Sequence, residues 1–394
     1  MEILKKLLDA RKKHFEKGGK LEKFHPIYEA NRTLFFIPGT TTKTGPHVRD
    51  GLDVKRFMTF VILALMPLFL FGVYNAGYYS NLASGASVDF IPVVLRGLVI
   101  VMPLLIVSYS VGLFWEGLFA VVRGHNISEG FLVTGLIFPL TLPPTTPLWQ
   151  AAVGISFGVV IGKEIFGGSG RNLFNPALTA RAFMFFAYPV SMSGDKVWVA
   201  AKTTIHTAVD AVSGATPLAV SMSTTGSDAI TGSLAKAGFT LNDLFFGFYP
   251  GSIGETSAFL CLIGGLFLCL TGIANYRIIL SGVLGVLVTG TILNTIAGPA
   301  SSPWLSLNPF YHLIMGGFAF GITFMATDPV SGPGMNSSKW IYGFCIGALT
   351  VIVRVFNPAY AEGTMLAILF MNLFAPLLDY IEIKVKLRKR IPNV

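Results

Sequence analysis

The sequence R-N-L-F-N-P-A at residues 171–177 returns in shortened form as R-V-F-N-P-A at residues 354–359. Each F-N-P-A motif opens an apolar run: residues 176–190 follow the first copy, and residues 364–382 follow shortly after the second. Related motifs at equivalent runs indicate an internal repeat, and inverted repeats with broken helices are typical of secondary transporters. The number and direction of the apolar runs decide whether this repeat is inverted.

The composition is that of a membrane protein. Only 12% of the 394 residues are charged, whereas about 25% is usual in soluble domains. A helix needs roughly 20 apolar residues to cross a bilayer. The sequence therefore predicts an all-α polytopic membrane protein with about ten transmembrane helices. Several of the runs are short or broken by Gly and Pro, and they cover residues 57–76, 93–121, 131–143, 148–165, 176–190, 253–274, 277–297, 309–326, 340–356 and 364–382.

Basic residues gather at the two ends of the chain, which predicts its orientation. Residues 1–56 hold 13 Lys/Arg against 7 Asp/Glu, and residues 383–394 form a basic tail. Since basic segments stay on the cytoplasmic side, both termini are expected in the cytoplasm and the long segment 191–252 outside. The two sets of five helices, residues 57–190 and 253–382, then run in opposite directions and form two inverted repeats.

The start of the chain, M-E-I-L-K-K-L-L-D-A-R-K-K-H-F, has the pattern of an amphipathic helix. We expect it to lie on the membrane or on a partner subunit; the alternative is a plain solvated helix. No signal peptide is expected, because the first apolar run begins only after a long polar lead. Arg354 lies near the outer end of a predicted span, where an ionisable residue is a functional candidate.

Several classes of site and partner are not indicated. The net charge of +9 is explained by membrane topology, so no nucleic-acid partner is expected. The three cysteines fall in apolar runs without a C-x-x-C pair, and the histidines show no pairing for a metal or haem. A dinucleotide-binding G-x-G-x-x-G in a strand–helix setting is also missing from the sequence.

The segment D-A-V-S-G-A-T at residues 210–216 is the main chemical candidate in the predicted outside loop. Pro217 prevents a helix from running through Thr216. One interpretation is an exposed threonine hydroxyl on a flexible, glycine-containing turn that a modifying enzyme can reach. The other is an ordinary turn or helix N-cap, which Ser and Thr both favour.

The segment resembles the flavin-attachment motif D-x-x-[ST]-G-A-T, and the whole chain resembles the family of B subunits of sodium-translocating NADH:quinone reductases. A sister family, the D subunits of Rnf-type ferredoxin:NAD reductases, lacks so long a basic lead. Besides the attachment motif, the resemblance rests on H-V-R-D-G-L-D-V-K-R-F-M (47–58), S-E-G-F-L-V-T-G (128–135), L-P-P-T-T-P-L-W-Q-A-A (142–152), G-K-E-I-F-G-G-S-G-R-N-L-F-N-P-A (162–177), P-G-S-I-G-E (250–255), F-M-A-T-D-P-V-S (324–331) and R-V-F-N-P-A-Y-A-E-G-T-M-L-A-I-L-F (354–370).

The resemblance implies two flavins. FMN would be linked through its phosphate to Thr216, with the other motif positions filled by Asp210, Ser213, Gly214 and Ala215. Riboflavin would be held without a covalent bond by Asn172 and Asn175, whose amides can hydrogen-bond a flavin edge without adding charge. The alternative for Asn175 is a cap on a broken helix.

The resemblance also implies a quinone and an ion. Ubiquinone would be reduced near Glu129, Gly130, Phe131 and Gly135, although glycines there also suit helix contact. Sodium, a hard cation, prefers oxygen ligands. The matching acids are Asp328, Asp379 and Glu29, for which capping or snorkelling is the alternative. Further acids near the spans are Glu116 and Glu164, the latter within reach of Arg171.

The implied activity is that of a translocase subunit in the bacterial inner membrane, passing electrons from FMN through riboflavin to quinone with sodium export. No catalytic acid or base is predicted, because cofactor placement sets electron transfer. Expected partners are an NADH-oxidising FAD/iron–sulfur subunit, a second FMN-bearing subunit and a flavin transferase. The alternatives are an Rnf-type D subunit, or an inverted-repeat transporter or channel without a redox group.

Overall fold

The computed structural model describes residues 54–124, 127, 130–201, 214–224, 230–298, 301–357, 360 and 362–389, with scattered positions between 10 and 46. All regular structure in these residues is helical. The elements are η1 (Glu22–Phe24), α3 (Val54–Ser84), α4 (Phe90–Arg123), α5 (Gly130–Leu140), α6 (Leu148–Val160), η2 (Glu164–Phe166), α7 (Pro176–Ala187), α8 (Pro189–Met192), α9 (Pro217–Ser223), α10 (Ile230–Lys236), α11 (Leu241–Phe246), α12 (Ala258–Leu270), α13 (Tyr276–Ile296), η3 (Pro303–Ser306), α14 (Pro309–Ile314), α15 (Phe318–Phe320), η4 (Gly321–Met325), α16 (Asn336–Phe356) and α17 (Thr364–Lys389).

The predicted polytopic helical architecture is confirmed. All ten apolar runs are helical, and six helices in the described part of the chain are long and apolar enough to cross a membrane. Three others, α5, α7 and α12, are shorter apolar helices. The eighth run is broken into α14, α15 and η4. Short and broken helices are tolerated in a membrane protein where protein surrounds them.

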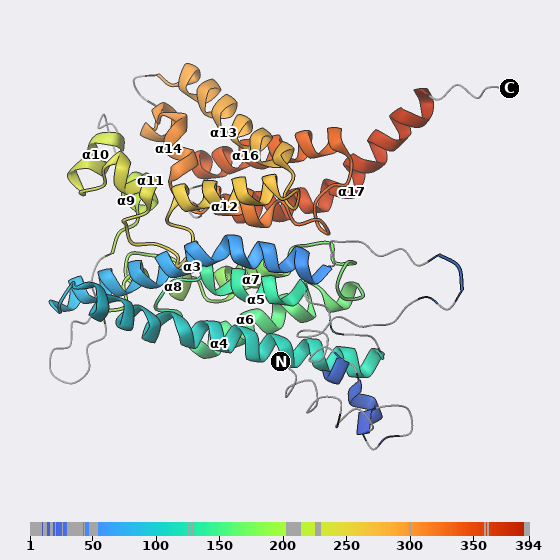
Figure 1. Ribbon diagram of the computed structural model, residues 1–394. Helices are drawn as coiled ribbons and strands as arrows, with labels where there is room; N and C mark the ends of the chain where they lie inside the picture. The colour runs from blue at the N-terminus through green and yellow to red at the C-terminus, as the bar shows by residue number, and fades with distance from the viewer. Residues whose placement is uncertain are drawn as a thin grey trace.

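The bundle consists of two sets of helices (Figure 1). In the first set α4 packs on α6 and α6 on α7, and in the second α13 packs on α16 and α16 on α17. Corresponding helices point in opposite directions, as α3 and α12 or α7 and α17 show (Figure 1). We propose residues 57–190 and 253–382 as the two repeats, 191–252 as the segment between them, and 1–56 and 383–394 as flanking segments.

Glycines allow the closest helix contacts of the second repeat. An added Cβ at Gly347 of α16 would collide with the carbonyl oxygen of Gly282 in α13, and one at Gly285 would collide with that of Phe344. Small residues let helix backbones approach closely where lipid supplies no hydrophobic driving force. The pattern explains why α13 and α16 form the most extensive helix pair of the molecule.

The described residues of the segment between the repeats, 191–201, 214–224 and 230–252, are folded against the bundle. Helices α9, α10 and α11 lie together at one end (Figure 1), with Leu218, Leu234 and Leu244 in a small buried cluster. Tyr79 of α3 donates a hydrogen bond to the Phe248 carbonyl at 2.8 Å. The expectation of a flexible, exposed turn at Thr216 was therefore wrong, because local hydrophobic packing orders this part of the chain.

The start of α3 and the end of α17 lie at the opposite end of the bundle from α9 (Figure 1). This arrangement is what an even number of crossings produces. The predicted amphipathic N-terminal helix falls largely outside the described residues. Which end faces the cytoplasm stays a prediction from the distribution of basic residues.

Candidate functional site

Two cavities lie between the repeats, one at each end of the bundle. The first, which we call the Thr216 cavity, has a volume of about 560 Å³. The second, the Asn172 cavity, has a volume of about 530 Å³. Both fall within the roughly 300–1,000 Å³ that is usual for small-molecule sites. Of the predicted site residues, Thr216 lines the first cavity, and Asn172, Asn175, Gly130 and Asp328 line the second.

Thr216 lies at the junction of the extended motif and helix α9. Its backbone is extended, Pro217 occupies the first helical position, and its hydroxyl oxygen accepts a hydrogen bond from the Ala219 N–H at 3.1 Å. Proline at this position and threonine before it are both favoured at helix starts. The N-cap interpretation is thus confirmed, yet the half-buried Thr216 also lines the cavity.

The rest of the described motif is tightly held. The Gly214 N–H donates to the Asp195 carbonyl at 2.8 Å, and an added Cβ at Gly214 would lie 2.6 Å from Val199 Cγ2. A glycine is therefore required here by close approach to the preceding segment. Ala215 is described as well and is half-buried, whereas Asp210 and Ser213 lie outside the described residues.

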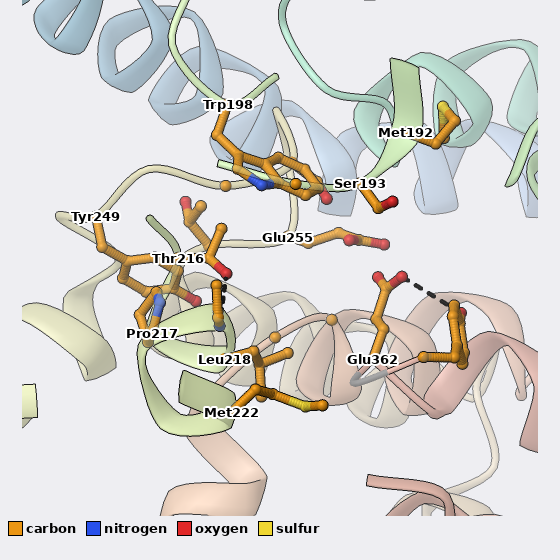
Figure 2. A pocket seen from close by; sticks show the side chains of 18 of the residues that line it. Met192, Ser193, Trp198, Thr216, Pro217, Leu218, Met222, Tyr249, Glu255 and Glu362 are labelled. Atoms are coloured by element: carbon orange, nitrogen blue, oxygen red, sulfur yellow. Dashed lines mark hydrogen bonds between the residues drawn. The ribbon is translucent and has the colours of Figure 1, made fainter. Parts of the chain in front are cut away.

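The walls of the Thr216 cavity come from both repeats and from the segment between them (Figure 2). Apolar side chains include Phe185, Met192 and Met222, and Trp198 lies across the cavity from Pro217 (Figure 2). Polar side chains come from the turn before α12 and the turn before α17, namely Tyr249, Ser252, Glu255, Thr256, Tyr360 and Glu362, and from Ser193, Thr216 and Ser223.

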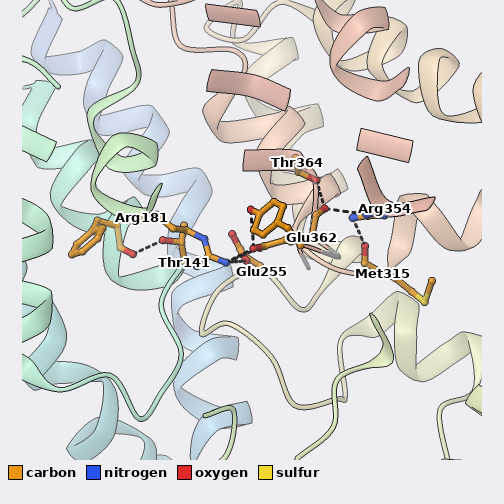
Figure 3. A network of polar contacts seen from close by, with 9 residues as sticks. Thr141, Arg181, Glu255, Met315, Arg354, Glu362 and Thr364 are labelled. Atoms are coloured by element: carbon orange, nitrogen blue, oxygen red, sulfur yellow. Dashed lines mark hydrogen bonds and ion pairs between the residues drawn. The ribbon is translucent and has the colours of Figure 1, made fainter. Parts of the chain in front are cut away.

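A buried ionic network joins the repeats beside this cavity (Figure 3). Arg181 of α7 donates to both carboxylate oxygens of Glu362, at 2.7 and 2.6 Å. The same nitrogen lies 4.0 Å from a carboxylate oxygen of Glu255. Arg181 thus forms ion pairs that link the two repeats. One guanidinium therefore serves two acidic side chains of the opposite repeat.

The two carboxyl groups, both in turns outside the helices, differ in their electrostatic surroundings. Glu255 is 7% exposed and lies 4.0 Å from the Arg181 guanidinium nitrogen. Burial raises the pKa of Glu362, but the charge and hydrogen bonds of Arg181 outweigh this effect and lower that pKa. An added Cβ at Gly317 would lie 2.9 Å from Glu255 Cδ, so this glycine makes room for the carboxyl group.

Arg354 has a supporting position in the same region. It is 1% exposed, and its guanidinium donates to the carbonyls of Glu362, His312 and Met315 at 3.0, 2.6 and 3.0 Å. These bonds tie the turn before α17 to the break between α14 and α15. The position near the end of a span predicted a functional group, but the three bonds to main-chain carbonyls indicate a structural role.

The Asn172 cavity brings together four of the predicted site residues: Asn172, Asn175, Gly130 and Asp328. Asn175 caps α7, since its side-chain oxygen accepts from the N–H groups of Ala177 at 3.0 Å and Leu178 at 3.4 Å. Its amide nitrogen reaches the Met325 carbonyl of the other repeat at 3.5 Å. The capping alternative is therefore confirmed, while the side chain also borders the cavity.

The predicted acidic sites are not brought together. Asp328 accepts from the Ser331 hydroxyl at 2.8 Å and from the Val330 N–H at 3.2 Å. Asp379 accepts from the N–H groups of Gly334 and Met335 at 2.7 and 3.0 Å. Glu29 lies 3.6 Å from His25 in the N-terminal segment. No group of three metal-ligating side chains occurs in the part of the chain that the structure describes.

Two other acids near the spans form ion pairs within the first repeat. Glu164 pairs with Arg123 at 3.0 Å, so the prediction of Arg171 as its partner was wrong. Glu116 pairs with Lys163 in the interior of the first repeat. Arg123 precedes Glu164 by 41 positions, and such contacts are invisible to local spacing.

Of the quinone candidates, only Gly130 borders a cavity in the described part of the chain. Phe131 is 1% exposed, and an added Cβ at Gly135 would lie 2.9 Å from the Tyr109 ring. The helix-contact alternative therefore accounts for Gly135. Glu129 lies outside the described residues.

The sequence reasoning missed Arg181, Tyr249, Thr256 and Glu362 as members of the Thr216 cavity or its network. Glu255 belongs to the family-like stretch P-G-S-I-G-E (250–255), but no role was predicted for it. A basic residue inside an apolar run was the available signal for Arg181, because buried charges need partners. No local signal identified the two hydroxyls.

Comparison with known proteins gives a consistent result. The sequence profile of the NQR2, RnfD, RnfE family matches residues 41–388. A protein of Pseudomonas aeruginosa strain LESB58, named as the B subunit of a Na(+)-translocating NADH-quinone reductase, is 45% identical over 411 residues, covering 98% of both chains. Proteins of the same name from Klebsiella pneumoniae strain 342 and Yersinia pestis are also 45% identical, over 416 residues and 98% of both chains. The similarity extends over both repeats and the segment between them.

Proposed function

Because the chain belongs to the NQR2, RnfD, RnfE family, we propose that it is the flavin-carrying membrane subunit of a sodium-translocating NADH:quinone reductase. The observation that carries this proposal is the half-buried Thr216, which ends a complete D-x-x-S-G-A-T motif at the wall of a ligand-sized cavity. A channel without a redox group has no need of this combination.

The residues present fit a tethered flavin. Unpartnered buried hydroxyls of Tyr249 and Thr256 in the described residues supply polar contacts, and Phe185, Met192 and Met222 supply an apolar surface. A phosphoester to the Thr216 oxygen would keep the group in place without binding affinity. Covalently bound FMN supplies the electron-accepting and electron-donating chemistry that no side chain of this chain has. The protein's part is to position the ring and to exclude water.

The Asn172 cavity is our proposed site for riboflavin. Asn172 and Asn175, which are 7% and 5% exposed, border it together with Thr134 and Thr327. Asn172 donates to the Phe174 carbonyl at 2.8 Å, which directs its side-chain amide. Amide and hydroxyl groups can pair with a flavin's polar edge without adding charge. We place ubiquinone reduction near Gly130 and sodium entry near Asp328, so both would occur beside this second flavin. Asp379 and Glu29 are further sodium candidates.

The complete activity needs other subunits. NADH oxidation would fall to an FAD/iron–sulfur partner, and a second FMN-bearing subunit would belong to the same complex. A flavin transferase attaches the FMN, and the complex resides in the bacterial inner membrane with both termini in the cytoplasm. A D subunit of an Rnf-type complex is the second candidate. The identity of 45% over 98% of proteins named as quinone reductase subunits favours the first.

The test of the proposal is the intact mass of the denatured chain after expression with the flavin transferase. The expected gain is one FMN minus one water, localised to the peptide that contains Thr216. An unmodified chain from cells in which the transferase modifies a second, established substrate would contradict the proposal.

Two substitutions of Asn175 separate its capping role from riboflavin binding. Asn175→Ala should lower stability by about 1 kcal/mol through loss of the cap and should also lose non-covalent flavin. Asn175→Asp retains the cap but lacks the amide donor, so it should keep the thermal midpoint while flavin is lost. The measurement is riboflavin released on acid precipitation, per chain. Retention of riboflavin by both variants would exclude Asn175 from the site.

A further inference from the structure

Two buried hydroxyl groups in the wall of the Thr216 cavity have no hydrogen-bond partner among the described residues. They belong to Tyr249, which is 3% exposed, and Thr256, which is 2% exposed. Both side chains line the cavity. A buried hydroxyl without a partner is unfavourable, and native structures seldom leave one unsatisfied. A group bound in the cavity would therefore supply the hydrogen-bond partners that these two hydroxyls lack.

The backbone that carries these hydroxyls is held on several sides. The carbonyl of Tyr249 accepts a hydrogen bond from Asn75 of α3 at 3.0 Å. The N–H groups of Ile253 and Gly254 donate to the carbonyls of Leu142 and Leu140, at 3.2 and 2.7 Å. Ser257, next to Thr256, caps α12. Such anchoring fixes the two hydroxyls before any ligand arrives, as positioning groups require.

The Tyr249 hydroxyl is directed toward the space beside Thr216 (Figure 2). The neighbouring Glu255 already has partners, because it faces Arg181 and Glu362 and hydrogen-bonds with Ser252. The methionines of the cavity offer little hydrogen bonding, whereas Trp198 carries one indole N–H donor. Tyr249 and Thr256 are the buried hydroxyl groups of this wall for which the described residues supply no partner.

We propose that Tyr249 and Thr256 are positioning residues that hold the polar pyrimidine edge of a flavin ring tethered to Thr216. This inference rests on the proposed function and extends it to two residues without an assigned role. The pyrimidine edge presents two carbonyl oxygens and one N–H, which suit hydroxyl groups that both donate and accept. The apolar benzenoid end of the ring then lies toward Phe185, Met192 and Met222.

The two hydroxyls also tune the flavin. Reduction adds negative charge to the pyrimidine edge, and fixed donors aimed at developing charge stabilise it in a site that excludes water. The Tyr249 and Thr256 hydroxyls thus favour the reduced form over the oxidised form. Their removal makes the covalent flavin harder to reduce without detaching it.

The test is the reduction potential of the covalent flavin in the purified complex, followed by its absorbance. Tyr249→Phe and Thr256→Val should each lower the equilibrium constant for reduction by about tenfold, which corresponds to about 30 mV for a two-electron couple or 59 mV for a one-electron couple. Thr256→Ser keeps the hydroxyl and should stay at the wild-type potential. Tyr79→Phe is the matched control, because its hydroxyl bonds the Phe248 carbonyl and does not line this cavity.

Fluorescence of the denatured chain in a gel measures flavin attachment separately. Wild-type protein without covalent flavin would overturn the proposed function and this inference together. Attached flavin whose potential is the same in Tyr249→Phe, Thr256→Val and Tyr79→Phe would overturn the inference alone. Should Tyr249→Phe fail to assemble, the contrast between Thr256→Val and Thr256→Ser decides the outcome.

Discussion

Replacing Thr216 with alanine is expected to abolish covalent flavin attachment completely. The substitution removes the only oxygen of the side chain, so no phosphoester can form at this position. It also removes the N-cap of α9, whose hydroxyl accepts from the Ala219 N–H, at a cost of about 1 kcal/mol. In-gel fluorescence of the denatured chain, expressed with the transferase, measures the attachment.

Two further variants separate the roles of Thr216. Thr216→Asn retains a good N-cap but lacks the hydroxyl, so it should lose the flavin while its thermal midpoint stays near that of the wild type. Thr224→Ala removes a threonine at the end of the same helix, where the hydroxyl bonds the Val220 carbonyl, and should leave the flavin in place. Fluorescence that persists on the denatured Thr216→Ala chain would place the attachment elsewhere.

Replacing Arg181 with methionine should destabilise the protein by about 3–5 kcal/mol, the usual cost of removing one partner from a buried ion pair. The Arg181 side chain is 3% exposed and that of Glu362 is 20% exposed, so the remaining carboxylate would lie largely buried between the repeats. Thermal unfolding in detergent, followed by tryptophan fluorescence, measures the loss.

The double variant Arg181→Met, Glu362→Leu should recover part of this stability, because it removes the carboxylate that Arg181 hydrogen-bonds directly while Glu255 remains. Lys386→Ala is the control, since the Lys386 side chain is 57% exposed in its pair with Glu382 and such pairs contribute about 0–1 kcal/mol. If Arg181→Met unfolds at the same temperature as Lys386→Ala, the network does not hold the repeats together.

Local patterns were sufficient for the architecture and for the attachment motif. Ten apolar runs identified the helices, and the paired F-N-P-A motifs at 174–177 and 356–359 indicated the repeat. These features can be predicted from local sequence because each helix must by itself be long and apolar enough to cross the bilayer. The same holds for Thr216 and Asn175, whose capping roles follow from proline at the next position.

Local patterns were insufficient wherever partners lie far apart along the chain. Arg123 rather than Arg171 satisfies Glu164, and Arg354 serves main-chain carbonyls rather than a substrate. The sequence also suggested a flexible turn at Thr216, whereas the described residues around it are ordered. Their buried leucines pack against elements that lie far away along the chain.

The sequence by itself determined that the chain is a helical membrane protein, and its motifs predict two related halves and a threonine for flavin attachment. Those properties depend on composition and on short motifs. Only the tertiary structure decided that Thr216, Tyr249, Thr256 and Glu362 line one cavity, with Arg181 bonded to Glu362 beside it. Arg181 and Glu362 are separated by 181 positions, and the packing of two oppositely directed repeats, not any local preference, brings them together.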